Sequence, residues 1–182
     1  ASGQNDGSSW ENAYIYLQDA LFEASIAEKP IEVRIAQGIY TPDKGANVEI
    51  EDIYASFEML NGVILSGGYA GQIPNQIQVD PNSRDIELYQ SILSGDLLNN
   101  DSNNYDPNNL VNDPNFFDNS YHIVTVSFTD ETTVLDGFTI TAGNARGYNN
   151  YYLDFDSTSR GGGIYIESAV GGPALYQSGS GP

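Results

Sequence analysis

The sequence predicts an all-β fold, a parallel β-helix (solenoid) of few coils with an N-terminal capping α-helix and long polar loops. Three observations predict it: short apolar strands recur along the chain, glycine-containing turns separate them, and one amphipathic helical pattern precedes them all. A chain that keeps returning to one short buried strand is typical of stacked turns, each covering the core of the last.

The composition limits the classes of partner. With 182 residues, the chain is long enough for one domain that buries about 70% of its unfolded surface. Six Lys and Arg against 25 Asp and Glu give a net charge of −19, which argues against nucleic acid or anionic lipid and favours calcium or another hard cation. The chain has no cysteine and no apolar run long enough to span a membrane. Its many Gly, Tyr and Asn and few Lys favour an extracellular or cell-surface location.

The N-terminal segment predicts a helix. Ser8, followed three residues later by Glu11, forms a capping-box pattern, and apolar side chains then recur on one helical face until Pro30 forbids continuation. We expect an N-terminal arm over residues 1–9 and a capping segment over 10–29, with the helix itself from about residue 10 to 28. The residues of its apolar face are Tyr14, Leu17, Leu21 and Ala24.

After Pro30 the apolar period changes to two, which predicts strands with one buried face. Such runs occupy residues 31–35, 56–60, 62–65, 91–93, 122–126, 133–141 and 163–166. They predict a β-helix over residues 30–170, followed by a Gly-rich tail over 171–182. Four isoleucines about 30 residues apart are predicted to be equivalent inward positions of successive coils: Ile35, Ile64, Ile92 and Ile123.

An ordered series of short motifs resembles a known family. The series comprises Gly7-Ser-Ser-Trp-Glu-Asn-Ala-Tyr, Ile35-Ala-Gln-Gly-Ile-Tyr-Thr-Pro, Ser66-Gly-Gly-Tyr-Ala-Gly, Ile92-Leu-Ser-Gly-Asp, Leu135-Asp-Gly-Phe-Thr-Ile-Thr-Ala-Gly-Asn and Gly161-Gly-Gly-Ile-Tyr. Residues 5–167 are thereby similar to the N-terminal region of secreted bacterial right-handed parallel β-helix (pectin-lyase-like) proteins, which are related to the polymorphic outer-membrane-protein repeat group. The resemblance implies fold and export rather than chemistry.

A solenoid with so few coils leaves an open edge, for which two explanations stay open. The chain is a piece of a longer protein, or it is a subunit whose open end is closed by a neighbour. In the second case the arm or the tail pairs with the next copy, and a head-to-tail filament forms.

The acidic loop that follows Ser94-Gly-Asp is the strongest chemical signal. Carboxylates alternate there with Asn side chains, as a hard cation with six to eight oxygen ligands requires. The candidate ligands for calcium are Asp96, Asp101, Asp106, Asp113 and Asp118. A solvated loop that uses Asn and Asp as turn formers explains the same pattern equally well.

The predicted function is that of an extracellular structural or adhesive module that assembles with itself or binds surface glycans. Three tyrosines in an Asn-rich loop, Tyr148, Tyr151 and Tyr152, are candidates for stacking on sugar or on protein. The alternative is a polysaccharide lyase, a glycoside hydrolase or a carbohydrate-binding module on the same fold.

The residues favour the non-enzymatic alternative. No basic residue stands in a lyase-like motif, and the spacing of Asp85 and Glu87, or of Asp154 and Asp156, permits an acid pair but arises easily by chance in so acidic a chain. Arg84 is expected to tether a loop through a carboxylate. The single His122 is expected to be a hydrogen-bonded structural imidazole, because the chain offers neither cysteine nor a second histidine.

Overall fold

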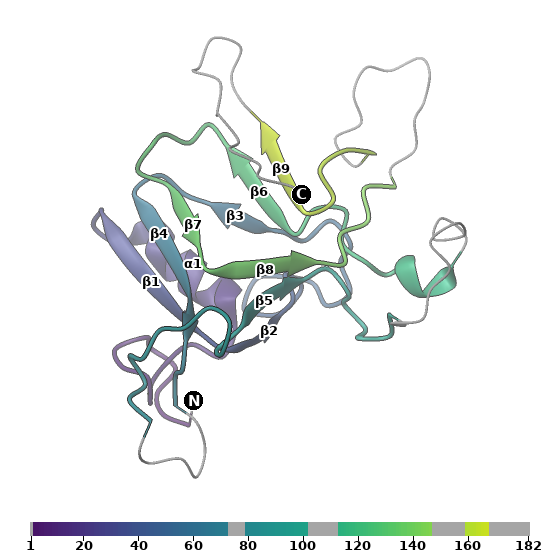
Figure 1. Ribbon diagram of the computed structural model, residues 1–182. Coiled ribbons are helices and arrows are strands. Elements are labelled where there is room, and N and C mark those ends of the chain that lie inside the picture. Colours follow the sequence, from purple (N-terminus) through teal and green to yellow (C-terminus); the bar gives the residue numbers. More distant parts are fainter. Residues whose placement is uncertain (1, 73–78, 102–112, 147–158, 168–182) are drawn as a thin grey trace.

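The computed structural model describes residues 2–72, 79–101, 113–146 and 159–167 (Figure 1). Over these residues the fold is built mostly of short strands with one α-helix, so the all-β expectation is confirmed. The helix is α1 (Leu17–Ile26), and a single 3₁₀ turn spans Pro114–Phe116. The strands are β1 (Ile31–Ala36), β2 (Gly38–Tyr40), β3 (Phe57–Met59), β4 (Val63–Tyr69), β5 (Ser91–Ser94), β6 (Val124–Ser127), β7 (Val134–Asp136), β8 (Phe138–Thr141) and β9 (Ile164–Glu167).

The strands form three parallel sheets, each of which takes every third strand of the chain. The orders are β1-β4-β7, β2-β5-β8 and β3-β6-β9, and every pairing within them is parallel. Three consecutive strands therefore belong to three different sheets, and the next three strands lie beside them in the same order. We call each set of three, β1–β3, β4–β6 and β7–β9, a rung. Figure 1 shows the three sheets at angles to one another, with the sheet β1-β4-β7 on the left, β2-β5-β8 below and β3-β6-β9 above.

The strand register places apolar side chains above one another. Leu65 of β4 pairs with Val33 of β1 and with Leu135 of β7. Val124 of β6 likewise pairs with Phe57 and Ile164. Because side chains alternate between the faces of a strand, these residues share the inner faces of their sheets. Phe57, Leu65 and Val124 are fully buried in one common core.

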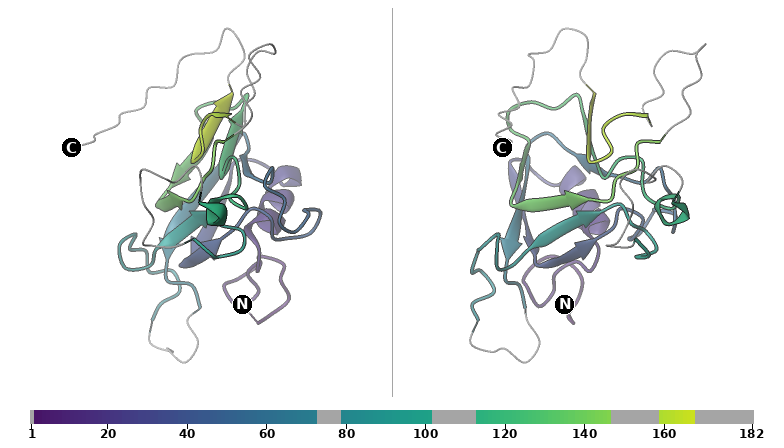
Figure 2. Two further views of the ribbon diagram at one scale, coloured as in Figure 1. Left: turned by 90° about the vertical axis from the view of Figure 1, so that its right-hand side faces the viewer. Right: turned by 45° about the vertical axis from the view of Figure 1, so that its right-hand side comes forward.

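Helix α1 packs against the inner side of the first rung, as the apolar face of the sequence predicts. Leu17, Ala20, Leu21 and Ala24 are buried and belong to the same core as the strands. In Figure 2 the helix lies on the side of β1, whereas β7 and β8 lie on the opposite side of the sheets.

The helix begins later than the sequence predicts, and the Ser8–Glu11 capping box does not form. Tyr16 is the N-cap and contributes no side-chain hydrogen bond. Residues 2–16 instead form turns, in which the Asn5 side chain accepts from the Ile15 amide at 2.7 Å and the Ser8 hydroxyl accepts from the Asn12 amide group. Short Asn, Asp and Ser side chains offer the backbone these local alternatives to a helix.

The predicted equivalence of the four isoleucines is wrong. Ile35 and Ile123 are buried, whereas Ile64 pairs with Glu32 and Val134 on the outer face of its sheet. Ile92 belongs to a different sheet, where it pairs with Ile39 and Thr139. The prediction counted Ile64, Ile92 and Ile123 as three successive coils, but these residues lie in β4, in β5 and directly before β6, which belong to a single rung. The near-constant spacing of the isoleucines was therefore a coincidence.

Glycine at position 137 divides the predicted 133–141 strand into β7 and β8. Its φ of +79° lies in the left-handed region, and a Cβ there would lie 2.8 Å from the Gly67 carbonyl oxygen. A residue with a side chain fits neither the conformation nor the space, so the chain turns from one sheet to the next at this glycine.

Candidate functional site

The acidic loop lies between β5 and β6, beside the ends of two sheets. The described residues include four of the five predicted ligands, and Asp106 lies outside them. A ladder of backbone hydrogen bonds holds this region in place. Gly95 N–H donates to the Thr141 carbonyl at 3.0 Å, Ser120 N–H donates to Gly95 at 2.9 Å, and Asn144 N–H donates to Ser120 at 2.8 Å. Segments from the second and third rungs therefore meet here.

Two of the carboxylates, those of Asp96 and Asp118, hold the turn between them. Asp96 accepts from the amides of Asn100 at 3.0 Å and Asp101 at 3.1 Å. Asp118 accepts from the Leu98 amide at 3.3 Å and from the Asn100 side chain at 3.2 Å. Their negative charges lie at the same turn, and the guanidinium carbon of Arg146 lies 3.8 Å from the centre of the ring of Phe117, the residue before Asp118.

Asp101 is the carboxylate that the structure partly buries in this turn. Its Oδ2 accepts from the Asn119 side chain at 2.8 Å, while its Oδ1 is buried and has no hydrogen-bond partner. Burial raises the pKa of Asp101 above its usual value. The charges of Asp96, Asp118 and Asp113 raise that pKa further, against the opposite effect of the Asn119 hydrogen bond.

Two residues that the sequence analysis did not name complete this turn. Asn119 is 2% exposed, and its Oδ1 has no partner; Ser120 is fully buried, and its hydroxyl likewise has none. The only sequence signal was their position directly after Asp118 in an Asn-rich loop. Asp113, in contrast, caps the 3₁₀ turn by accepting from the Asn115 amide at 3.1 Å. It influences Asp101 by charge alone among the contacts described.

A second polar cluster lies on the outer face of the sheet β1-β4-β7. The guanidinium carbons of Arg34 and Arg84 are each 5.6 Å from the centre of the Tyr69 ring. Arg34 is paired with Glu32 at 3.0 Å, and Arg84 is paired with Asp136. Arg84 also donates to the Gly67 carbonyl at 2.8 Å, so it tethers its loop to two strands. The sequence predicted such a tether through a carboxylate, which is that of Asp136.

The Asp85–Glu87 spacing does not produce an acid pair. Asp85 Oδ1 accepts from the amides of Glu87 and Leu88, each at 3.0 Å, and therefore serves as a turn former. Asp154, Asp156 and the three candidate tyrosines Tyr148, Tyr151 and Tyr152 lie outside the described residues.

His122 has structural contacts. Its Nδ1 lies 3.2 Å from the Gly161 carbonyl oxygen, and its ring stacks on that of Tyr165 with the ring centres 4.7 Å apart. It thus joins β6 to β9, as expected of a structural imidazole.

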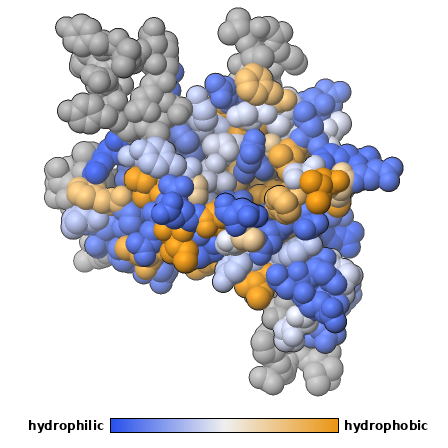
Figure 3. All heavy atoms as spheres, turned by 180° about the vertical axis from the view of Figure 1, so that it is seen from behind, coloured by the Kyte–Doolittle hydropathy of each residue, from blue (hydrophilic) through white to orange (hydrophobic). Residues whose placement is uncertain are grey.

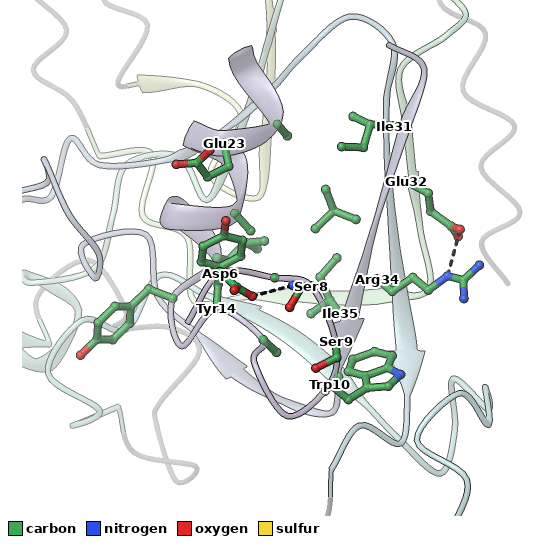
Figure 4. A pocket seen from close by; sticks show the side chains of 18 of the residues that line it. Asp6, Ser8, Ser9, Trp10, Tyr14, Glu23, Ile31, Glu32, Arg34 and Ile35 are labelled. Carbon is green, nitrogen blue, oxygen red and sulfur yellow. Dashed lines mark hydrogen bonds and ion pairs between the residues drawn. The ribbon is translucent and has the colours of Figure 1, made fainter. Parts of the chain in front are cut away.

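A groove of about 610 Å³ separates α1 from β1 (Figure 4). Its walls are the inward side chains Ile31, Val33 and Ile35, the facing side of α1 and the N-terminal turns. Figure 4 shows Glu32 and Arg34 on the other face of β1, pointing away from the groove. Among the described strands, β1 pairs only with β4, and no described strand pairs with its other edge beside this groove.

The inner side of the last rung is open among the described residues. Ile164 and Ile166 of β9 pair with buried or half-buried residues of β6, yet they are 36% and 40% exposed. Leu135, Phe138 and Ile140 of the same rung are only partly buried. Figure 3 shows the face of the molecule on which α1 lies, seen from behind. Apolar and hydrophilic side chains are interspersed on that face.

Comparisons with protein-family models, with curated proteins and with solved structures found no match for this chain. Within the described residues, no helix is long and apolar enough to cross a membrane.

Proposed function

We propose that the chain is a module of a right-handed parallel β-helix that serves an extracellular structural or adhesive role and associates with further copies through its last rung. The observation that carries the proposal is the set of three parallel edge strands, β7, β8 and β9, which have no further partner strand among the described residues. On their inner side Ile164 and Ile166 of β9 are exposed, and Leu135, Phe138 and Ile140 are only partly buried. Such edges recruit further strands, and the rungs within this chain show the geometry that a partner must supply.

The first rung supplies a complementary edge in the sheet β1-β4-β7. The strand β1 has a free edge at one end of this sheet, and β7 has a free edge at the other. A β7 that added beside the β1 of the next copy would continue the same parallel order from one copy to the next. The groove beside β1 is where such a strand approaches, and the head-to-tail contact that results propagates as a filament.

The test is a comparison of two lysine variants of the last rung. Ile166→Lys places a charge on the inner face of β9, where the wild-type side chain is 40% exposed. Thr139→Lys places the same charge on the outer, exposed face of β8. Sedimentation velocity over a range of concentrations is expected to show association for the wild type and for Thr139→Lys, and monomers for Ile166→Lys, because only the inner charge must be desolvated in the contact.

Circular dichroism and thermal unfolding establish that both variants retain the fold. A wild-type chain that remains monomeric at every concentration, or an Ile166→Lys variant that associates as the wild type does, overturns the proposal.

The second candidate is a carbohydrate-active or carbohydrate-binding function on the outer face of the sheet β1-β4-β7. The observation that favours it is the cluster of Tyr69 with two arginines and their carboxylate partners Glu32 and Asp136. Hydrogen bonds from Ser66 and Arg34 lower the pKa of Glu32, although burial alone would raise it. A carboxylate held ionised in this way suits a base better than an acid.

A panel of neutral and acidic polysaccharides separates the two candidates. Release of reducing ends or of unsaturated products, abolished in Glu32→Gln, supports the enzymatic function. Binding without turnover supports a carbohydrate-binding module instead.

A further inference from the structure

The turn at Asp101 and Asn119 contains buried oxygen atoms that no group of the described structure satisfies. Asp101 Oδ1 and Asn119 Oδ1 are both buried without a partner, although the two side chains touch through their other atoms at 2.8 Å. Buried polar atoms without partners are rare in folded proteins because each one loses its hydration. Two such atoms on two contacting side chains are acceptors that one bound cation or water could satisfy together.

The surroundings supply the charge that a cation requires. Asp96 and Asp118 lie at the same turn, where both carboxylates accept hydrogen bonds from residues 98–101. The turn itself is fixed by the backbone ladder through Gly95 and Ser120. A preformed turn with one buried carboxylate, one buried amide and two nearby carboxylates matches the oxygen-rich environment that calcium prefers.

We propose that Asp101 and Asn119 bind a hard divalent cation, calcium in particular, through their side-chain oxygens, with Asp96 and Asp118 supplying further negative charge. Within the described residues, no three acidic or histidine side chains converge on one point, so water completes the coordination shell. Calcium tolerates such an irregular shell better than magnesium, which demands octahedral geometry. The proposal is independent of the proposed function, since it concerns a site between β5 and β6 rather than the last rung.

A site with few protein ligands is weak. We expect a dissociation constant of about 10⁻⁴ to 10⁻³ M, the range of extracellular calcium modules.

The test uses thermal unfolding and isothermal titration with calcium chloride at constant ionic strength, with magnesium chloride as the comparison. The variant Asp101→Asn preserves the shape and the acceptor for Asn119 but removes the buried charge. Glu131→Gln is the matched control, since it removes one charge from an exposed turn away from the site. Both variants are measured at a protein concentration at which the wild type is monomeric.

We expect the effect of Asp101→Asn on thermal stability to depend on whether calcium is present. Without calcium, Asp101→Asn melts at a higher temperature than the wild type, because the mutation relieves repulsion among four carboxylates. With calcium, the wild type and Glu131→Gln gain stability, while Asp101→Asn gains none. Asp118→Asn is expected to weaken calcium binding about tenfold, as the loss of a supporting carboxylate does in metal sites.

Equal calcium stabilisation of the wild type and of Asp101→Asn overturns the proposal, because it indicates diffuse screening of the acidic surface. Absence of any calcium-dependent heat or melting shift in the wild type overturns it as well. A larger response to magnesium than to calcium contradicts the choice of cation.

Discussion

At the scale of single residues, buried polar groups organise this fold as much as apolar ones do. Ser91 is 1% exposed, and its hydroxyl donates to the carbonyls of Ile35 and Ala36 while it accepts from the Gly68 amide at 2.9 Å. One side chain thereby joins strands of two sheets where the chain turns between them. Asp43 organises the loop between β2 and β3, where it is fully buried and accepts hydrogen bonds from Thr41, Lys44 and the Glu51 amide.

The Asp43 carboxylate is held ionised by its partners. Burial alone would raise its pKa, but hydrogen bonds from Lys44 at 2.7 Å, Thr41 at 2.7 Å and the Glu51 amide at 3.0 Å outweigh burial and lower it. A folded pKa below the unfolded one contributes stability above the unfolded pKa, and that stability is lost as the pH falls through the folded pKa.

We expect Asp43→Asn to lower the free energy of unfolding at neutral pH by about 1–3 kcal/mol, since it weakens hydrogen bonds to a charged acceptor. Below the folded pKa the wild-type group is itself protonated, so the difference between variant and wild type should shrink. Urea unfolding at neutral and acidic pH measures both values, with the exposed Glu49→Gln as control. A difference that is constant with pH would contradict this account.

At the scale of elements, α1 is a helix with weak capping signals in its own sequence, and packing against the strands stabilises it. It lacks a side-chain N-cap, and Asp19 is its only acidic residue in the first turn. Its apolar side chains nevertheless complete the core that the first rung leaves open. Tertiary burial, rather than capping, therefore stabilises this helix.

Neighbouring residues of α1 provide a matched test. Leu21 is 5% exposed and belongs to the core, whereas Phe22 is 53% exposed. Leu21→Ala is expected to lower the free energy of unfolding by about 2–5 kcal/mol through lost burial and the cavity left behind. Phe22→Ala is expected to change it by less than about 0.5 kcal/mol. Similar losses for both variants in urea unfolding would show that α1 does not cover the core as described.

The sequence predicted the elements better than their boundaries. Alternation of apolar and polar residues located the strands, because a half-buried strand needs that pattern wherever it lies. The start of α1 and the equivalence of the isoleucines were wrong, since both depend on contacts between distant segments. The same is true of Asp113, which the sequence grouped with Asp101 but which caps a separate 3₁₀ turn.

At the scale of the whole molecule, the net charge of −19 opposes the proposed contact between copies. Like charges repel over about 10 Å at an ionic strength of 0.1 M, and added salt shortens this range. Salt does not weaken the contribution that burial of the apolar inner side of the last rung makes to association in the same way. The two contributions can therefore be separated.

We expect self-association of the wild type to become stronger as sodium chloride is added, because screening removes the repulsion and leaves the burial of apolar side chains. Sedimentation velocity at low and high salt measures the change, and Ile166→Lys serves as the control that stays monomeric at both. Association that weakens with salt would show that ion pairs, rather than the open rung, hold the copies together.

By itself, the sequence determined that this protein builds short strands around one apolar core, with a helix before them and acidic, Asn-rich loops between them. Only the tertiary structure decided which strands pair and which oxygens meet, because pairing depends on the stacking of rungs across loops of unequal length. Thus Ile64 pairs with Glu32 rather than with another predicted inward isoleucine. Asp101 meets Asn119 for the same reason, since the ladder through Gly95 and Ser120 brings the two ends of the acidic loop together.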